Sequence, residues 1–491
     1  MTPVDQSAYG APLSPLESER SEGVAALFRI ALGFAALFAA AIFFLNASAV
    51  LAEGKAILTF LLSLAVLAAA VAVSRLPDAR GIVTVCILLF GCALRFSFAI
   101  LADAEPTSDY ALFYDGAQAV LGRNLAYFDN YYFTLYPNLI PICYFFAGIF
   151  RISNTLLAVR LVNALLLSGT LVLLYLLARL YANRSAANAA LLLYALYPAS
   201  IIMASQLTNQ TPALFLFLAG LYVLIRYQTL PAAVLSGALV AVGDLLRSEA
   251  IVLHAGLVAV CLILIVSALV KKDRAALRKR ISLLLAYALT AALSGILLTG
   301  VFSRASGHTV STDSSYAWKL VIGLNDAESG SYNGHYVEEF QQTHDAMPIV
   351  KRHIAEQDDW LDFFRRKETI LWGDYEYASL SLAGLDETAP IALGPFETDL
   401  NGLVRRGQIA DKAVYTAILA LLAVGLAILA FRKDAPTPAE AIAILVFDAY
   451  VSAYLLIEVA PRYRYFIIPF LLLLSLPALH TAPKRLQSAK M

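Results

Sequence analysis

Charged side chains are scarce in this sequence. Asp, Glu, Lys and Arg make up only 15% of its 491 residues, whereas soluble domains carry about 25%. Basic and acidic residues number 36 each, so the formal net charge at pH 7 is zero. Nucleic-acid-binding domains carry an excess of basic residues, and this balance therefore argues against a nucleic-acid partner.

Cysteine is also scarce. All four cysteines (Cys86, Cys92, Cys143 and Cys261) lie in apolar segments, where a thiol usually behaves as a small buried hydrophobe. No disulfide framework is therefore predicted. Residues 1–23 lack the apolar core of a signal peptide, so we interpret them as a disordered cytoplasmic tail, with targeting left to the first apolar helix.

Long apolar runs dominate the rest of the chain. The sequence is 60% hydrophobic, with a mean hydropathy of +0.71, and about 20 apolar residues suffice for a helix to cross a bilayer. These features predict an all-α polytopic membrane protein with about twelve transmembrane helices. The candidate spans are residues 24–46, 56–74, 82–102, 155–179, 186–203, 210–226, 232–246, 250–270, 281–301, 411–431, 438–457 and 465–480.

The orientation follows from the short basic loops, because Lys and Arg collect on the cytoplasmic side. Placing both termini in the cytoplasm puts nearly every such loop inside, including the cluster Lys271–Arg280. Counting "YPNLIPICYFFAGIF" (136–150) as a span would place that cluster on the outer side of the membrane. We therefore expect this stretch to lie in the membrane interface as an amphipathic helix.

The predicted spans divide the chain into six parts. An acidic segment, 302–410, is long enough for a small soluble domain on the outer face. Within it, "DDWLDFFRRKETILWG" has helical spacing and forms either a helix packed in that domain or a helix lying on the membrane as a lid. The remaining parts are the tail 1–23, an accessory hairpin 24–74, a catalytic module 75–301 with outer loop 103–154, the C-terminal helices 411–480 and a cytoplasmic tail 481–491.

The stretch "EPTSDYALFYDGAQAVLGRN" (105–124) places two acids just outside the bilayer. Ser108 or Asp109 resembles the cap of a helix that ends near Gly122. Capping alone could account for Asp109. Asp115 lies six residues on, a rotation of about 240°, so the two acids do not share a helical face. Asp109 and Asp115 are the candidate catalytic carboxylates.

Two further clusters carry charge at the predicted outer boundary. In "GDLLRSEAIVL", Asp244, Arg247 and Glu249 stand at a hairpin apex, where they are either solvated or face a cavity. In "EVAPRYRYFIIPF", tyrosines and arginines either form an interfacial belt or hold a phosphate through forked guanidinium donors. The candidate substrate-binding residues are Arg247, Glu249, Glu458, Arg462, Tyr463 and Arg464.

The histidines of segment 302–410 do not have the short helical spacing of a ligand pair. No metal site is therefore predicted from His308, His335, His344 and His353. No cofactor is predicted either, and the question of a divalent metal requirement stays open.

With these pieces located, the chain resembles the GT-C class of membrane glycosyltransferases. Within it, the resemblance is to the bacterial branch related to protein O-mannosyltransferases and the lipid A aminoarabinose transferase, over roughly residues 82–480. It rests on the order of short motifs, namely "SDYALFYDGAQAVL", "LLLYALYPASIIMASQLTNQTPALFLFLAGLYVLIR", "LLRSEA", "WKLVIGLNDAESGSYN" and "PRYRYFIIPFLLL". By resemblance, Asp109 occupies the position of the family's first-loop acid. Many relatives have Asp-Glu there, whereas this chain has Asp109-Tyr110.

The resemblance implies transfer of a sugar, with inversion, from a polyprenyl-phosphate donor to an acceptor hydroxyl on the outer face of the cell membrane. The acceptor would be a cell-envelope glycan, lipid or protein. The alternatives are a multi-pass transporter or flippase for a lipid-linked glycan, and a non-catalytic assembly partner. A transporter usually binds its substrate at the bilayer midplane and shows internal repeats, whereas here no repeat is evident and the charges gather at the outer boundary.

Overall fold

A computed structural model describes residues 22–52, 54–77, 81–102, 105–334, 336–343, 345–375, 391–393, 396–432, 434 and 436–479. The predicted C-terminal tail 481–491 and all but the last two residues of the predicted tail 1–23 lie outside these ranges. Histidines 335 and 344, considered above as metal ligands, lie outside them as well.

The described chain is predominantly helical, as predicted. Eight of its helices are long and apolar enough to cross a membrane, and a bent pair with a 63° break raises the number to nine. The eight are α1 (Glu22–Ala52), α2 (Ala56–Arg75), α3 (Ile82–Leu101), α7 (Leu156–Tyr181), α10 (Gln210–Tyr227), α12 (Ala250–Val270), α13 (Arg274–Ser306) and α19 (Leu400–Phe431). The bent pair consists of α8 (Arg184–Leu196) with α9 (Pro198–Ile202) and η4 (Met203–Ser205).

The number of twelve spans therefore stays a prediction. Helices lie at the three remaining positions, but α11 (Leu230–Leu246), α20 (Pro438–Tyr454) and α21 (Ile468–Leu479) are shorter than a full crossing. The structure also corrects one boundary. Helix α19 begins at Leu400, inside the segment predicted to be soluble, because its first turns continue the apolar helix outward.

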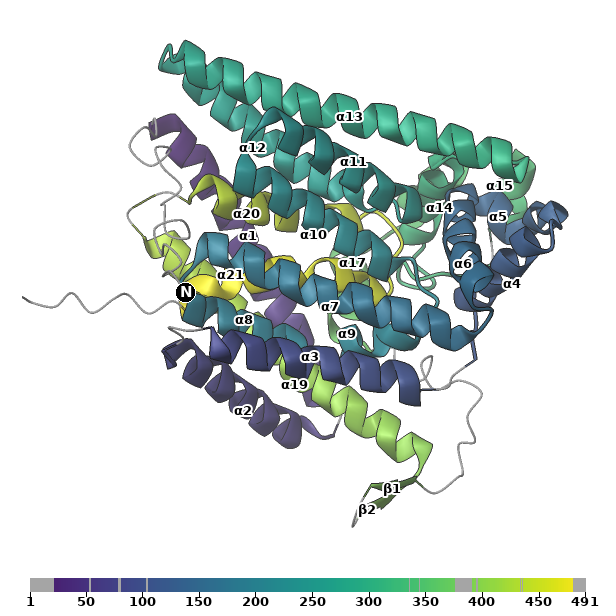
Figure 1. The fold of residues 1–491 in the computed structure, drawn as a ribbon, viewed down its shortest axis with the longest axis horizontal. Helices are drawn as coiled ribbons and strands as arrows, with labels where there is room; N and C mark the ends of the chain where they lie inside the picture. Colours follow the sequence, from purple (N-terminus) through teal and green to yellow (C-terminus); the bar gives the residue numbers. More distant parts are fainter. Residues whose placement is uncertain are drawn as a thin grey trace, which may run out of the picture.

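Helix α6 (Ile140–Ile152) corresponds to the stretch expected in the membrane interface. It is an apolar helix of 13 residues, too short to cross a bilayer. It packs against α4 (Asp109–Leu121) and lies across the direction of α7 at one end of the bundle (Figure 1). Both features agree with the interfacial placement.

Helix α13 shows which loops share an end of the bundle. Its 33 residues span about 50 Å, along the outside of the molecule (Figure 1). Its first residues follow the basic turn at Lys271, and just beyond its last residue His308 Nε2 lies 2.9 Å from Asp129 Oδ1. The basic turn and the loop that follows α4 therefore lie at opposite ends.

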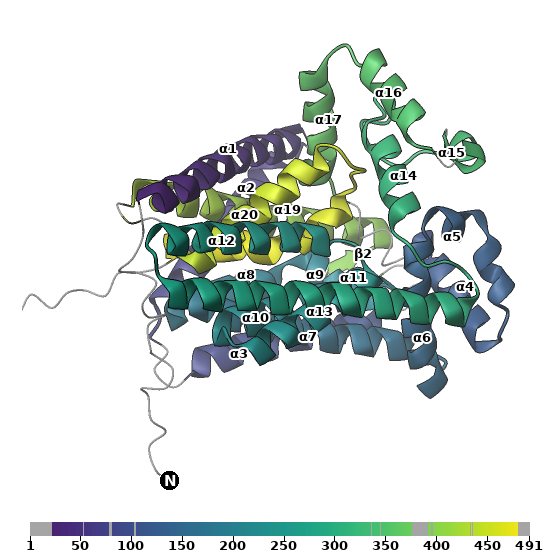
Figure 2. The ribbon, with the colours of Figure 1, turned by 90° about the horizontal axis from the view of Figure 1, so that it is seen from above.

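Segment 302–410 meets the first loop at the same end of the bundle (Figure 2). Helix α14 (Asp313–Gly323) packs against α5 (Tyr131–Leu135) and η3 (Pro137–Leu139). Helix α17 (Trp360–Gly373) packs against the end of α1 and against η5 (Pro461–Phe466), and the choice between its two predicted placements stays open. The remaining elements here are η2 (Leu125–Asp129), α15 (Val337–Thr343), α16 (Met347–Glu356) and the antiparallel pair β1 (Ile391–Leu393) and β2 (Phe396–Thr398).

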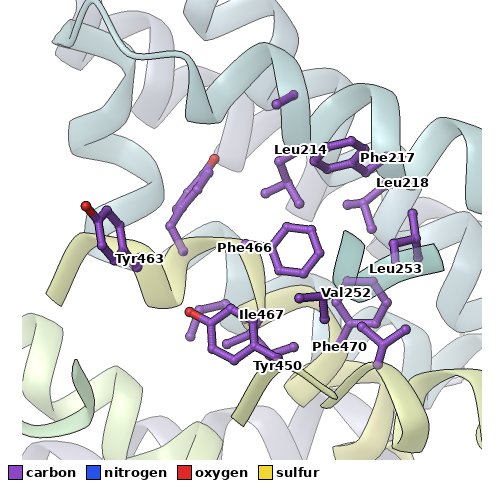
Figure 3. Close-up of a cluster of buried hydrophobic side chains, with 14 of the residues drawn as sticks. Leu214, Phe217, Leu218, Val252, Leu253, Tyr450, Tyr463, Phe466, Ile467 and Phe470 are labelled. Atoms are coloured by element: carbon purple, nitrogen blue, oxygen red, sulfur yellow. The ribbon is translucent and has the colours of Figure 1, made fainter. Parts of the chain in front are cut away.

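A buried aromatic cluster holds η5 in place (Figure 3). The Phe466 ring stacks on Tyr450 of α20 with centroids 5.9 Å apart, and it meets Phe217 of α10 edge-on at 5.8 Å. Rings packed in this way contribute more than their buried area alone. The cluster fixes the segment that carries Arg462 and Tyr463.

Candidate active site

A cavity of about 400 Å³ lies where the loops at this end of the bundle meet. Its charged lining residues come from four separate parts of the chain: Asp109, Arg247, Lys319, Glu458 and Arg462. Its aromatic lining includes Tyr132, Tyr136 and Tyr463. The sequence predicted four of these five charged residues for the site. The fifth, Lys319, was not predicted.

Asp109 begins α4 and faces this cavity. Ser108 makes no side-chain capping bond, so the capping interpretation does not account for this helix start. Arg462 Nη2 instead donates to Asp109 Oδ2 at 3.1 Å. A carboxylate in the first turn is also favoured by the helix dipole. Asp109 is therefore held in the cavity by its partner on η5.

The turn between α11 and α12 supplies Arg247. Its Nη2 lies 2.6 Å from Glu249 Oε1, and its Nη1 donates to Asn209 Oδ1 at 3.1 Å. The Tyr454 hydroxyl donates to the same Glu249 oxygen at 3.3 Å. Arg247 lines the cavity, while Glu249 does not. The sequence left open whether the charges at this hairpin apex are solvated or face a cavity. Arg247 faces a cavity.

Three cations surround the ring of Tyr463. Arg247, Arg462 and Lys319 place their charged groups 5.2, 5.5 and 5.9 Å from the ring centroid. A cation within about 6 Å of an aromatic face is attracted by the ring quadrupole. The ring thus contacts three cations, of which Arg247 and Arg462 are also paired with the carboxylates of Glu249 and Asp109.

Lys319 was not singled out by the sequence reasoning. It lies on α14, within "WKLVIGLNDAESGSYN", the stretch that also carried part of the family resemblance. Its main-chain carbonyl accepts from the Glu458 N–H at 2.9 Å. Burial, reinforced by Arg247, lowers the pKa of Lys319, and burial raises the pKa of Glu458 against the opposite effect of Lys319.

Polar contacts tie the cavity loops to one another. Asn138 Nδ2 donates to Ser248 Oγ at 3.0 Å, and Ser315 Oγ donates to Asn138 Oδ1. Gln210 Nε2 donates to the Arg462 carbonyl at 3.3 Å. The first loop, α14, the α11–α12 turn and η5 are thus held together through residues whose roles no spacing could indicate.

Three predicted site residues do not line this cavity, namely Glu249, described above, Arg464 and Asp115. Arg464 is fully buried, 3.4 Å from Asp411 Oδ2, with its guanidinium 4.6 Å from the Tyr415 ring centroid. It lines neither this cavity nor the larger one beside it. Asp115 lies beside Tyr127, away from the cavity, as its rotation on α4 requires. Neither Arg464 nor Asp115 therefore lines the candidate site, and their roles stay predictions.

Within the described ranges, no three His, Cys, Asp or Glu side chains come close enough together to hold a metal ion. His308 contacts Asp129, and His353 lies against the Tyr336 ring. The candidate site is therefore built on carboxylates and cations.

A family model described as "Dolichyl-phosphate-mannose-protein mannosyltransferase" matches residues 140–297 of the chain. The match supports a membrane glycosyltransferase of the GT-C type. It runs from α6 to most of α13 and includes Arg247, whereas Asp109, Lys319 and Arg462 lie outside it. No curated protein and no solved structure matches the chain significantly.

Proposed function

We propose that this protein transfers a sugar from a polyprenyl-phosphate donor to an acceptor hydroxyl, with inversion, on the extracytoplasmic face of the cell membrane. The observation that carries the proposal is the meeting of two carboxylates, Asp109 and Glu458, with three cations in one cavity, where Asp109 pairs directly with Arg462. Phosphate is well recognised by guanidinium and ammonium groups. A carboxylate beside these cations can take the proton of a hydroxyl.

Arg247, Lys319 and Arg462 would hold the donor phosphate against Tyr463. Each is already oriented by a fixed partner or by the ring. Such prearranged donors stabilise the charge that develops on a leaving group. A phosphate leaves as an anion, so it needs this stabilisation more than it needs a proton from a second acid.

Asp109 would act as the general base. An alcohol is a poor nucleophile at neutral pH, and a carboxylate within about 2.6–3.2 Å of it can take its proton during attack. The bond between the anomeric carbon and the phosphate oxygen breaks as the bond to the acceptor oxygen forms. The proton passes to Asp109, and the products are the glycosylated acceptor and polyprenyl phosphate.

The test begins with mass spectrometry of lipids that co-purify with the full-length protein, which should identify a polyprenyl-phosphate sugar as donor. Asp109→Asn should keep the protein folded and the donor bound while turnover falls by about 100- to 10,000-fold. Asp115→Asn is the matched control, because Asp115 lies on the same helix outside the cavity. It should turn over as the wild type does.

Wild-type turnover by Asp109→Asn would contradict the assignment. If Glu458→Gln were then inactive, the base would be Glu458, which lines the same cavity. If both variants and Asp115→Asn stayed active, the proposed mechanism would be wrong.

A further inference from the structure

A second, larger cavity of about 760 Å³ adjoins the first. Tyr332, Glu458 and Arg462 line both cavities and so form the wall between them. Arg462 also binds Asp109 at 3.1 Å, so the proposed base lies just across this wall. A molecule in the second cavity would therefore approach Asp109 across the wall that contains Arg462, from a side that Arg247 and Lys319 do not line.

The second cavity lies at the edge of the predicted membrane. Lys55, one of its lining residues, stands in the turn between α1 and α2, and both of these helices are long and apolar enough to cross a bilayer. Arg405 lines it from the first turns of α19, against which α1 and α2 both pack. Charges where apolar spans end lie at the level of lipid headgroups.

The lining combines cations with groups that can contact hydroxyls. Lys55 and Arg405 are exposed, and Asp374, Gln408 and Ser331 lie among the other lining residues. Ammonium and guanidinium groups recognise phosphate or carboxylate, while a carboxylate and an amide accept from or donate to hydroxyls. Burial raises the pKa of Glu458 in the shared wall, against the opposite effect of Lys319 and Arg462.

Resting on the function proposed above, we propose that this second cavity binds the acceptor, and that the acceptor is a lipid whose headgroup carries a negative charge next to a free hydroxyl. Lys55 and Arg405 contact the charge, and the hydroxyl passes the wall at Tyr332 and Arg462 to reach Asp109. Lys55 and Arg405 lie outside the matched range 140–297, so this specificity belongs to parts of the chain that the family model does not cover.

The experiment measures lipid binding by native mass spectrometry of the full-length protein. Phosphatidylglycerol is the probe, because its headgroup has a phosphate and free hydroxyls, and phosphatidylcholine is the neutral comparison. The wild type should bind phosphatidylglycerol at least tenfold more tightly. The double variant Lys55→Gln/Arg405→Gln should lose this preference. Arg406→Gln, a change at the next residue of α19, which is exposed and does not line the cavity, should keep it.

Three results would overturn the proposal. They are equal binding of the two lipids by the wild type, an equal loss in Arg406→Gln, and full displacement of the lipid by soluble glycerol phosphate at the same concentration. The last result would show recognition of free phosphate rather than of a lipid. Asp109→Asn should bind phosphatidylglycerol as the wild type does, so failure of the catalytic assignment would leave this readout unchanged and the two failures can be told apart.

Discussion

At the scale of single residues, the site depends on one pair that the sequence separates widely. Asp109 and Arg462 are 353 positions apart, yet their side chains meet at 3.1 Å. Each was proposed as a site residue because it is charged and lies at the predicted outer boundary of the membrane. Their pairing was not predictable, because it depends on how α4 and η5 pack. The same limit applies to Arg464, whose sequence context resembles that of Arg462 while its side chain points into the protein.

Lys319 should contribute to donor binding as strongly as the arginines. Lys319→Met removes one of the three cations around Tyr463 while keeping the apolar stem. A charge-assisted hydrogen bond contributes about 1.5–3 kcal/mol, so donor affinity should fall by roughly 10- to 100-fold. The check is the donor's apparent Michaelis constant. Arg304→Met, on the exposed end of α13, serves as control. An unchanged donor dependence for Lys319→Met would remove Lys319 from the phosphate site.

Lys367 should make stability depend on pH. It is buried on α17 and its ammonium donates to the Gly323 and Leu455 carbonyls. Burial lowers the pKa of Lys367 to about 7, whereas an unfolded lysine titrates near 10.4. The unfolded chain therefore binds more protons between about pH 7 and 10, and folded-state stability rises with pH in that window.

The measurement compares thermal unfolding of the wild type and Lys367→Met in detergent from pH 7 to 9. The stability of the wild type relative to the variant should increase as the pH rises. A difference that stays constant over this range would show that Lys367 keeps an ordinary pKa in the folded protein.

At the scale of elements, the breaks between helices were the most predictable feature. Charged residues in the run after Pro231 predicted a turn, and α11 ends at Leu246 and α12 begins at Ala250. The start of α4 was equally clear. The packing of α17 on α1 and η5 was not, because amphipathic spacing shows that a helix buries one face without showing against which partner.

Gly323, at the end of α14, allows the chain segment 456–458 to pack directly against the helix backbone. A Cβ atom there would meet main-chain atoms of Leu456, Ile457 and Glu458. Gly323→Ala should push this chain segment away and displace Glu458, since overpacking usually costs about 1–3 kcal/mol. We expect a lower melting temperature together with a several-fold loss of turnover. Gly334→Ala, where nothing lies within 4 Å of the added atom, should change neither. Equal behaviour of the two variants would contradict this account.

At the scale of the whole molecule, the two predicted outer regions gather at one end of the bundle (Figure 2). The sequence predicted them separately, from loop lengths and from the positions of Lys and Arg. It could not show that they build one site, because α14 and the first loop meet only through the folded bundle. The number of spans was less predictable, since short helices such as α21 are shielded by protein and need not match the bilayer thickness.

The orientation can be tested by cysteine labelling in a background without the four native cysteines, of which Cys86 is exposed. With an impermeant maleimide on whole cells, a cysteine at Glu338 on α15 should react, and one at Lys272 in the basic turn should not. The positive-inside rule gives this direction. Labelling at position 272 with none at 338 would invert the topology and place the proposed site in the cytoplasm.

Helix α21 has a consequence for biogenesis. It has 12 residues, and its side chains up to Leu476 are buried between α8, α19 and α20. A helix this short gains little from leaving the translocon for lipid on its own, so it docks onto a bundle that has already been inserted. Arg462 and Tyr463 lie in η5, which precedes α21 by a single residue. Asp109, Arg247 and Lys319 all precede this segment in the chain, so docking of α21, with η5 before it, is the step that brings Arg462 to the other charged residues of the cavity.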